Sequence, residues 1–188
     1  DMPDTSVPPV TDKKNLDTKL SIIEKMAVVD FALWGGISGN VYREGNWQRS
    51  MRELKQAGVV GFKCYLISGM AEFRHLMPLD LIEVMRFAKE TGSLVGLHAE
   101  DRELVVSLQA LMQTSGKRDA MAYYEARKDP AEENGARFGV AIARETGNSL
   151  HIVHVGSAGA AAAIAEAKKD GFDIPGETCA HYLEFSFE

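Results

Sequence analysis

The chain has 188 residues, 45% of them hydrophobic, and a formal net charge of −6 at pH 7. This length can bury a substantial core and indicates one domain or part of a larger one. The acidic balance and the lack of a basic stripe argue against a nucleic-acid partner, and no apolar run approaches the ~18 residues that span a membrane. Cys64 and Cys179 are too few for a disulfide framework, which favours reduced thiols and a cytoplasmic location.

Helices and strands are predicted to alternate along the chain. Prolines make residues 1–11 a loop, and further loops are expected at residues 36–45 and 67–78. Apolar residues at helical spacing, followed by glycines, predict helices around residues 16–23, 47–54, 81–88, 104–111, 121–128, 130–142 and 158–168. Short apolar runs predict strands at residues 27–36, 59–66, 93–98, 148–155 and, weakened by Pro175, 172–183.

Three segments share one layout, in which a helix stops at glycine, an apolar strand follows and a polar residue closes it. They are QAGVVGFK, ETGSLVGLH and ETGNSLHIVH, which end at Lys63, His98 and His154. Such alternation implies a parallel sheet with crossover helices, either an open doubly wound sheet or a closed (β/α)8 barrel. Ligands bind at the carboxyl ends of the strands in both folds, so these three side chains are expected on one face.

A lysine in a buried strand is unusual, because an unpaired ammonium is costly to bury. An ammonium has no lone pair for a metal, but a neutral lysine amine can add carbon dioxide and become an anionic carbamate that bridges two ions. Two histidines at matching strand ends favour zinc or a similar ion. His151 lies three residues before His154, so alternation is expected to turn it to the opposite face, packed against a helix.

The motifs GFKCYL, LVGLHAED, LHIVHVGSA and GETCAHYL together resemble the cyclic amidohydrolases, which include allantoinases, dihydroorotases and hydantoinases or dihydropyrimidinases. GFKCYLISGMAEF with ETCAHYL is most similar to the allantoinase branch. The resemblance implies a (β/α)8 barrel with two divalent metal ions, usually zinc, bridged by carboxylated Lys63. His98 and His154 would then ligate the second metal ion.

Further residues bear on the substrate. Hydantoinases carry a tyrosine a few residues after the bridging lysine, whereas this chain has Ser68, which favours allantoinase. Asp4 and Thr5 stand where allantoinases and dihydroorotases have an asparagine near the substrate. Thr5 and Ser68 are the candidate substrate-binding residues. Glu100 is either an orienter of a metal ligand or a solvated loop acid.

Two more histidines and one substitution complete the motif comparison. His181 either approaches the pocket or is a structural residue at a strand end, and His75 is expected at the surface. Ala180 replaces the usual proline of CPHYL, a change that we expect to be benign.

The resemblance also implies parts that these residues do not contain. The family's first strand carries a His-x-His pair, and its last strand carries a metal-binding aspartate that acts as the general base. A complete barrel takes ~250 residues. Residues 1–188 are therefore expected to be the central part of a single barrel domain, without its first and last strands, with the aspartate beyond the C-terminus and no turnover by the fragment alone.

The predicted activity of the intact enzyme is ring opening of allantoin to allantoate, by a homo-oligomer, either a dimer or a tetramer, acting on a small cyclic ureide. Three alternatives stay open. The first is the same chemistry on hydantoin, dihydropyrimidine or dihydroorotate. The second is a non-catalytic scaffold, which would have no chemical need for Lys63, His98 and His154. The third is an open-sheet binding protein with Lys63 as an anion contact, although no Gly-rich phosphate loop follows any strand.

Overall fold

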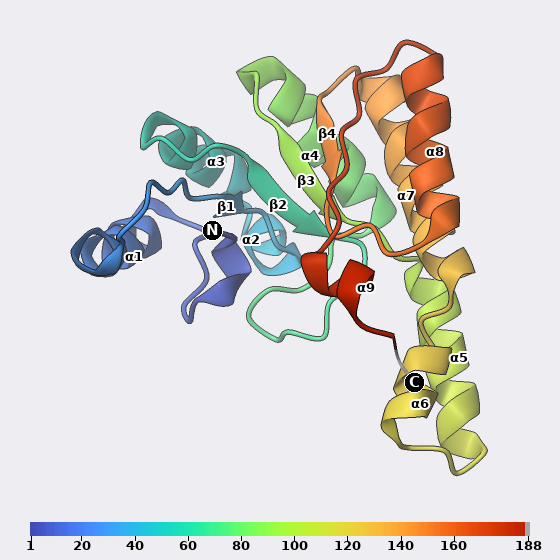
Figure 1. The fold of residues 1–188 in the computed structure, drawn as a ribbon. Coiled ribbons are helices and arrows are strands. Elements are labelled where there is room, and N and C mark those ends of the chain that lie inside the picture. The colour runs from blue at the N-terminus through green and yellow to red at the C-terminus, as the bar shows by residue number, and fades with distance from the viewer. Residues whose placement is uncertain (187–188) are drawn as a thin grey trace.

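The computed structural model describes residues 1–186 and is built around a four-stranded parallel sheet (Figure 1). The strands are β1 (Gly35–Gly36), β2 (Phe62–Tyr65), β3 (Val95–His98) and β4 (Leu150–Ile152), and they lie side by side in chain order. All three pairings are parallel. Parallel neighbours in chain order need crossover connections, and helices supply them here. The predicted parallel α/β fold is confirmed, as part of a barrel.

Helices make up most of the rest of the described chain. They are α1 (Lys13–Met26), α2 (Gly39–Glu44), α3 (Trp47–Gln56), α4 (Pro78–Thr91), α5 (Arg102–Thr114), α6 (Ala120–Glu125), α7 (Asp129–Thr146), α8 (Ala158–Lys169) and α9 (Ala180–Glu184), with a 3-10 turn at Pro3–Thr5. The glycine stops act as predicted, since Gly92 and Gly147 end α4 and α7 in the left-handed conformation. Asp101 caps α5 by accepting from the backbone N–H of Leu104.

Helices α3 and α7 contact one face of the sheet and leave the other face to the site. Leu97, Leu150 and Ile152 reach Gly139 of α7, where an added Cβ would lie 2.8 Å from Leu97. On that side, α8 packs against α7, while α5 and α6 extend away from the sheet (Figure 1). On the opposite face, the Trp34 ring lies against Gly96, where a Cβ would come within 2.8 Å of it. Alternation therefore separates a helix-facing row from a second row that includes Lys63 and His98.

Three sequence predictions are wrong in part. The strand expected at residues 27–36 is paired only at Gly35–Gly36. Val28 and Val29, which precede these residues, are 94% and 75% exposed, so they do not pack in the sheet. The loop expected at residues 36–45 contains α2, because Ser38 caps its start and Gly45 closes its end. Residues 172–183 form only an isolated bridge at Gly176 and then α9.

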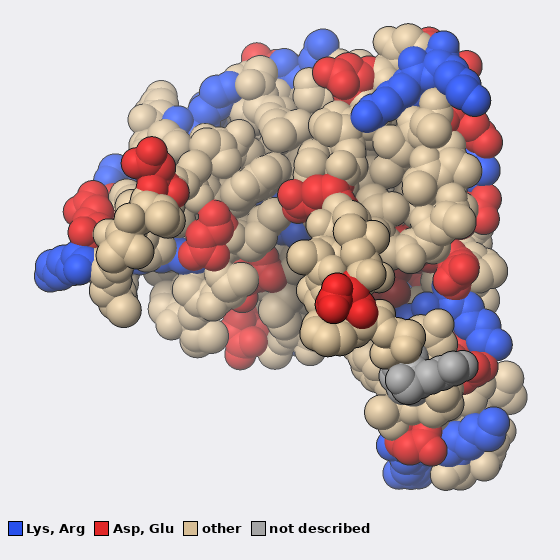
Figure 2. All heavy atoms as spheres, viewed as in Figure 1, with Lys and Arg blue, Asp and Glu red and all other residues tan. Residues whose placement is uncertain are grey.

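The surface carries its charges in small groups. Figure 2 shows basic and acidic side chains dispersed around a largely uncharged face. Many of them are paired, as in the exposed ion pairs Arg86–Glu145 and Arg144–Asp170. Among the described residues, no helix is both long and apolar enough to cross a membrane.

Candidate metal centre

Lys63 is held in β2 with almost no contact with solvent. It is 2% exposed, and its partners in the parallel register are Gly36 and Gly96, against which the rings of Phe73 and Trp34 pack. Nζ lies 3.6 Å from the centroid of the Tyr65 ring. It makes no hydrogen bond to any described residue. A buried amine without a hydrogen-bond partner is costly for stability, so its presence points to a functional use.

Burial lowers the pKa of Lys63 to about 8, and the nearby carboxylate of Asp4 opposes this shift. Desolvation penalises the charged form of a lysine. About a tenth of the amine is therefore neutral at pH 7, far more than for an ordinary lysine. Only the neutral amine has the lone pair that attacks carbon dioxide.

His98 ends β3 directly beside Tyr65, its register partner on β2. The two rings stack, with centroids 4.8 Å apart and planes at 22°. The imidazole contacts a side chain through each nitrogen. Nδ1 lies 2.8 Å from Nε2 of His154, and Nε2 lies 2.7 Å from a carboxylate oxygen of Glu100. Tyr65 and Glu100 thus fix the plane and direction of the His98 ring.

His154 lies just beyond β4, which ends at Ile152. Its backbone φ is +43°, and no other non-glycine residue in the described chain has a positive φ. This conformation costs a side-chain-bearing residue about 1 kcal/mol or more and is typical of functional sites. Burial, followed by the neighbouring His98 and Lys63, lowers the pKa of His154 to about 4. The imidazole is therefore neutral at pH 7, the form that binds metal.

Glu100 connects this pair to Arg127. One of its oxygens faces His98, and the other lies 3.9 Å from the Arg127 guanidinium. Burial acts to raise the pKa of Glu100, but the hydrogen bond from His98 and the charges of His98 and Arg127 lower it overall. Glu100 is thus held against His98 and is not a solvated loop acid, whereas its role as an orienter of a metal ligand stays a prediction.

Arg127 was not anticipated from the sequence. It lies in the polar stretch after α6, and its guanidinium stacks on the Tyr123 ring at 4.1 Å. The arginine at the end of the helical stretch 121–128 was the only available signal, and nothing local distinguishes it from a solvated arginine.

The side chains present fit a metal ion at His98 and His154. Zn–N bonds of about 2.0–2.1 Å at a tetrahedral angle place two nitrogens about 3.3 Å apart. The observed 2.8 Å separation needs only a small opening for both rings to bind one ion. Within residues 1–186, however, no three or more His, Cys, Asp or Glu side chains cluster as metal ligands. A lysine converted to a carbamate would add oxygen ligands that the unmodified chain lacks.

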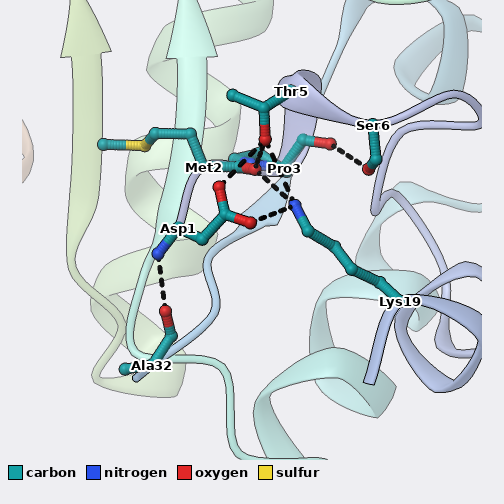
Figure 3. Close-up of polar contacts among 7 residues, drawn as sticks. All are labelled: Asp1, Met2, Pro3, Thr5, Ser6, Lys19 and Ala32. Carbon is teal, nitrogen blue, oxygen red and sulfur yellow. Dashed lines mark hydrogen bonds and ion pairs between the residues drawn. The ribbon is translucent and has the colours of Figure 1, made fainter. Parts of the chain in front are cut away.

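The two candidate substrate-binding residues make local contacts. Figure 3 shows the Thr5 hydroxyl beside Asp1, the Met2 carbonyl and Lys19, with distances of 2.9, 2.8 and 3.3 Å respectively. Ser68 accepts from the backbone N–H of Met70 at 3.1 Å. Their role in binding substrate therefore stays a prediction.

Asp4, the neighbour of Thr5, is the residue of this segment that reaches the site. It accepts the Tyr65 hydroxyl at 2.6 Å through Oδ2. Its other oxygen, Oδ1, is buried without a hydrogen-bond partner among the described residues.

The interpretation of His151 as a residue packed against a helix is wrong. His151 pairs with Gly96 in the register and contacts Trp34, with ring centroids 6.4 Å apart, and Nε2 lies 3.5 Å from Glu177. Leu150 and Ile152 face α7 instead. The alternation argument failed because His154 lies outside the strand, where alternation no longer applies.

The other two histidines lie away from the imidazole pair. His181 is exposed in α9, and its ring contacts that of Tyr182. His75 is half-buried, not fully at the surface, and lines a separate cavity of about 380 Å³.

A large cavity opens beside the imidazole pair. Its volume is about 1030 Å³, and its lining includes His98, Glu100, Arg127, His154 and Tyr182. Its mixed polar and aromatic lining and its position at the carboxyl ends of β3 and β4 suit a small polar ligand. The cavity that holds the histidine pair is therefore the candidate substrate pocket.

The comparisons with known proteins agree with this fold and site. No protein-family model matches the chain. An L-hydantoinase (dihydropyrimidinase) from Arthrobacter aurescens superimposes with a TM-score of 0.90 at 25% identity, covering 99% of this chain and 40% of that one. The chain thus has the fold of the cyclic amidohydrolases and is homologous to them along its whole length, which confirms the resemblance seen in its motifs.

The proteins that are similar to this chain in sequence include allantoinases. That of Bacillus velezensis is 38% identical over 189 residues, which cover 100% of this chain and 40% of the relative. That of Solibacter usitatus is 39% identical over 188 residues, which cover 99% of this chain and 40% of the relative. The chain therefore spans about 40% of the length of the curated relatives that it matches.

Proposed function

We propose that the full-length gene product containing this chain is a metal-dependent cyclic amidohydrolase that opens allantoin to allantoate. The observation that carries the proposal is the buried Lys63 amine, which has no hydrogen-bond partner in the described chain and lies against the same Tyr65 ring as His98. The allantoinase relatives support the choice of substrate. We take residues 1–188 to be the central part of one barrel domain.

The residues present would carry distinct tasks. The Lys63 amine attacks carbon dioxide, so that an N–C bond forms and one proton leaves to solvent, and the product is a carbamate with two oxygen ligands. His98 and His154 would bind one of two divalent cations, most simply zinc. Glu100 accepts from Nε2 of His98, which leaves the Nδ1 lone pair directed at the cation. Bound cations would polarise the ring carbonyl and activate the attacking water.

The fragment by itself is not expected to turn over. Two zinc ions with about four ligands each need more donors than one carbamate and two imidazoles supply. We therefore expect no allantoin hydrolysis from residues 1–188 alone, and hydrolysis by this fragment would contradict the assignment of its missing ligands.

The experiment that tests the proposal compares substrates. The full-length gene product, loaded with zinc in bicarbonate buffer, would be assayed on allantoin, hydantoin, dihydrouracil and dihydroorotate. Allantoin is expected to have the highest kcat/KM. A higher kcat/KM on another ring would change the assigned substrate but leave the assignment as a cyclic amidohydrolase in place. An absence of both hydrolysis and bound metal would overturn that assignment and favour a non-catalytic scaffold.

Hydantoin is the second candidate substrate. The structural neighbour with a TM-score of 0.90 is a hydantoinase, which supports this alternative. Ser68, where hydantoinases have tyrosine, disfavours it. Location in the cytoplasm and assembly into a dimer or tetramer stay predictions.

A further inference from the structure

The Tyr65 ring contacts two of the three candidate metal-site residues. Lys63 Nζ lies 3.6 Å from its centroid, and the His98 ring stacks on it at 4.8 Å. Such contacts depend on where the ring lies, since a rotation about its side-chain bonds would remove both. The orientation of Tyr65 therefore affects Lys63 and His98 together.

A distant residue fixes that orientation. The Tyr65 hydroxyl donates to Oδ2 of Asp4 at 2.6 Å, across 61 positions of sequence. Burial, and then this hydrogen bond, raises the pKa of Tyr65, so the phenol keeps the proton that it donates. Hydrogen bonds to a charged acceptor are stronger than those between neutral groups.

Asp4 is itself held in place. Its segment is tied to the chain around β1 by two backbone bonds, from Trp34 to Asp1 and from Gly36 to Val10. Lys19 of α1 adds side-chain contacts to Asp1, Thr5 and the Met2 carbonyl, which are drawn in Figure 3. These contacts hold the segment that carries Asp4 in place, and they thereby fix the position of its carboxylate relative to Tyr65.

We propose that Asp4 and Tyr65 act as a positioning pair, in which Asp4 locks the Tyr65 ring so that Lys63 and His98 are held in the geometry that binds metal. The inference rests on the proposed function, because it assigns these two residues a role toward the metal. It gives Asp4 a task that Thr5 does not perform in this structure. It also gives a reason for the position of the half-buried Asp4 beside Tyr65, although its Oδ1 atom is buried without a hydrogen-bond partner among the described residues.

The chain offers a matched control. Tyr42 donates to Glu83 at 2.6 Å, the same kind of bond at the same distance, but neither residue contacts Lys63, His98 or His154. Loss of the Tyr42–Glu83 bond should cost stability without changing the metal site.

The test measures zinc affinity by chelator competition in the full-length protein. Asp4→Ala and Tyr65→Phe are each expected to weaken zinc binding at least ~10-fold, as loss of groups that orient ligands commonly does. The double variant should bind zinc no more weakly than either single variant, because both substitutions remove the same bond. Asp4→Asn keeps an acceptor oxygen and should restore most of the affinity, and Tyr42→Phe and Glu83→Ala should leave it unchanged.

A metal-free readout separates this inference from the proposed function. In the metal-free protein, the NMR signals of the His98 ring should move in Asp4→Ala and Tyr65→Phe and stay in place in the two control variants. If the wild-type protein binds no zinc, the proposed function fails, and the His98 signals still decide whether the pair positions that ring. The proposal would be overturned if the His98 signals do not move in Asp4→Ala and Tyr65→Phe, or if these variants lose less than ~10-fold in zinc affinity. It would also be overturned if the effects add up in the double variant or if the two control variants show equal effects.

Discussion

Nδ1 of His98 and Nε2 of His154 lie 2.8 Å apart, although 56 positions of sequence separate the two residues. Since Nε2 of His98 is occupied by Glu100, the hydrogen-bond network assigns the shared proton to Nε2 of His154 and the lone pair to Nδ1 of His98. A metal ion bound between them would have to displace that proton. The two imidazoles are thus joined by one hydrogen bond, which binding of an ion would replace.

Replacing Lys63 should raise the stability of the metal-free protein. Lys63→Met removes a buried amine without a hydrogen-bond partner and keeps a chain of similar length, and replacing buried charged groups by apolar ones can stabilise by about 1–4 kcal/mol. Urea denaturation would measure the change. Lys19→Met is the control, because Lys19 is also buried but is bonded to Asp1 and the Met2 carbonyl, and its loss should destabilise. A less stable Lys63→Met protein would contradict the cost assigned to this amine.

Removing the charge of Glu100 should weaken metal binding. Glu100→Gln keeps the shape of the side chain but no longer draws the Nε2 proton of His98 as strongly, so the Nδ1 lone pair becomes a poorer ligand. We expect zinc affinity to fall about 10–100-fold, measured by chelator competition. Glu103→Gln, at a side chain that is 82% exposed, should have no effect. Equal affinities in the wild type and Glu100→Gln would show that Glu100 does not orient His98.

A methyl group at Gly96 should destabilise the fold. The added Cβ would lie 2.8 Å from the Trp34 ring, and overpacking of this kind typically costs about 1–3 kcal/mol. The thermal midpoint of Gly96→Ala should fall below that of the wild type. Gly69→Ala serves as the comparison, since nothing lies within 4 Å of its Cβ and its φ is not positive. If both variants have the same thermal midpoint as the wild type, the Trp34 ring can move away from the added Cβ.

Alkaline pH should weaken the Tyr42–Glu83 contact. The hydrogen bond to Glu83, followed by burial, raises the pKa of Tyr42 to about 12 from its ordinary value of 10.0. A raised folded-state pKa means that the contribution is complete below pH 10 and is lost as the pH rises through 12. The stability difference between the wild type and Tyr42→Phe should therefore shrink over that window in urea titrations. A constant difference from pH 9 to 12 would argue against the bond.

Local signals account for much of what could be predicted. Helix stops depend on neighbours within a few residues, so the glycines that follow α4 and α7, Gly92 and Gly147, were predicted correctly. The repeated glycine–strand–polar layout also located His98 and His154 at one end of a parallel sheet, because parallel strands share the direction of their carboxyl ends. Lys63 was predicted to close its strand in the same way, but it lies within β2, which continues to Tyr65.

What the sequence by itself determined is the parallel α/β fold, the family resemblance and the set of chemically capable residues, since all of these follow from local spacing and composition. The tertiary structure decided which of those residues meet. It turned Asp4 and not Thr5 toward Tyr65, brought Arg127 to Glu100, and placed His151 against Trp34. Each of these contacts joins positions far apart in the chain, and chain packing, which no local pattern encodes, sets their distance and direction.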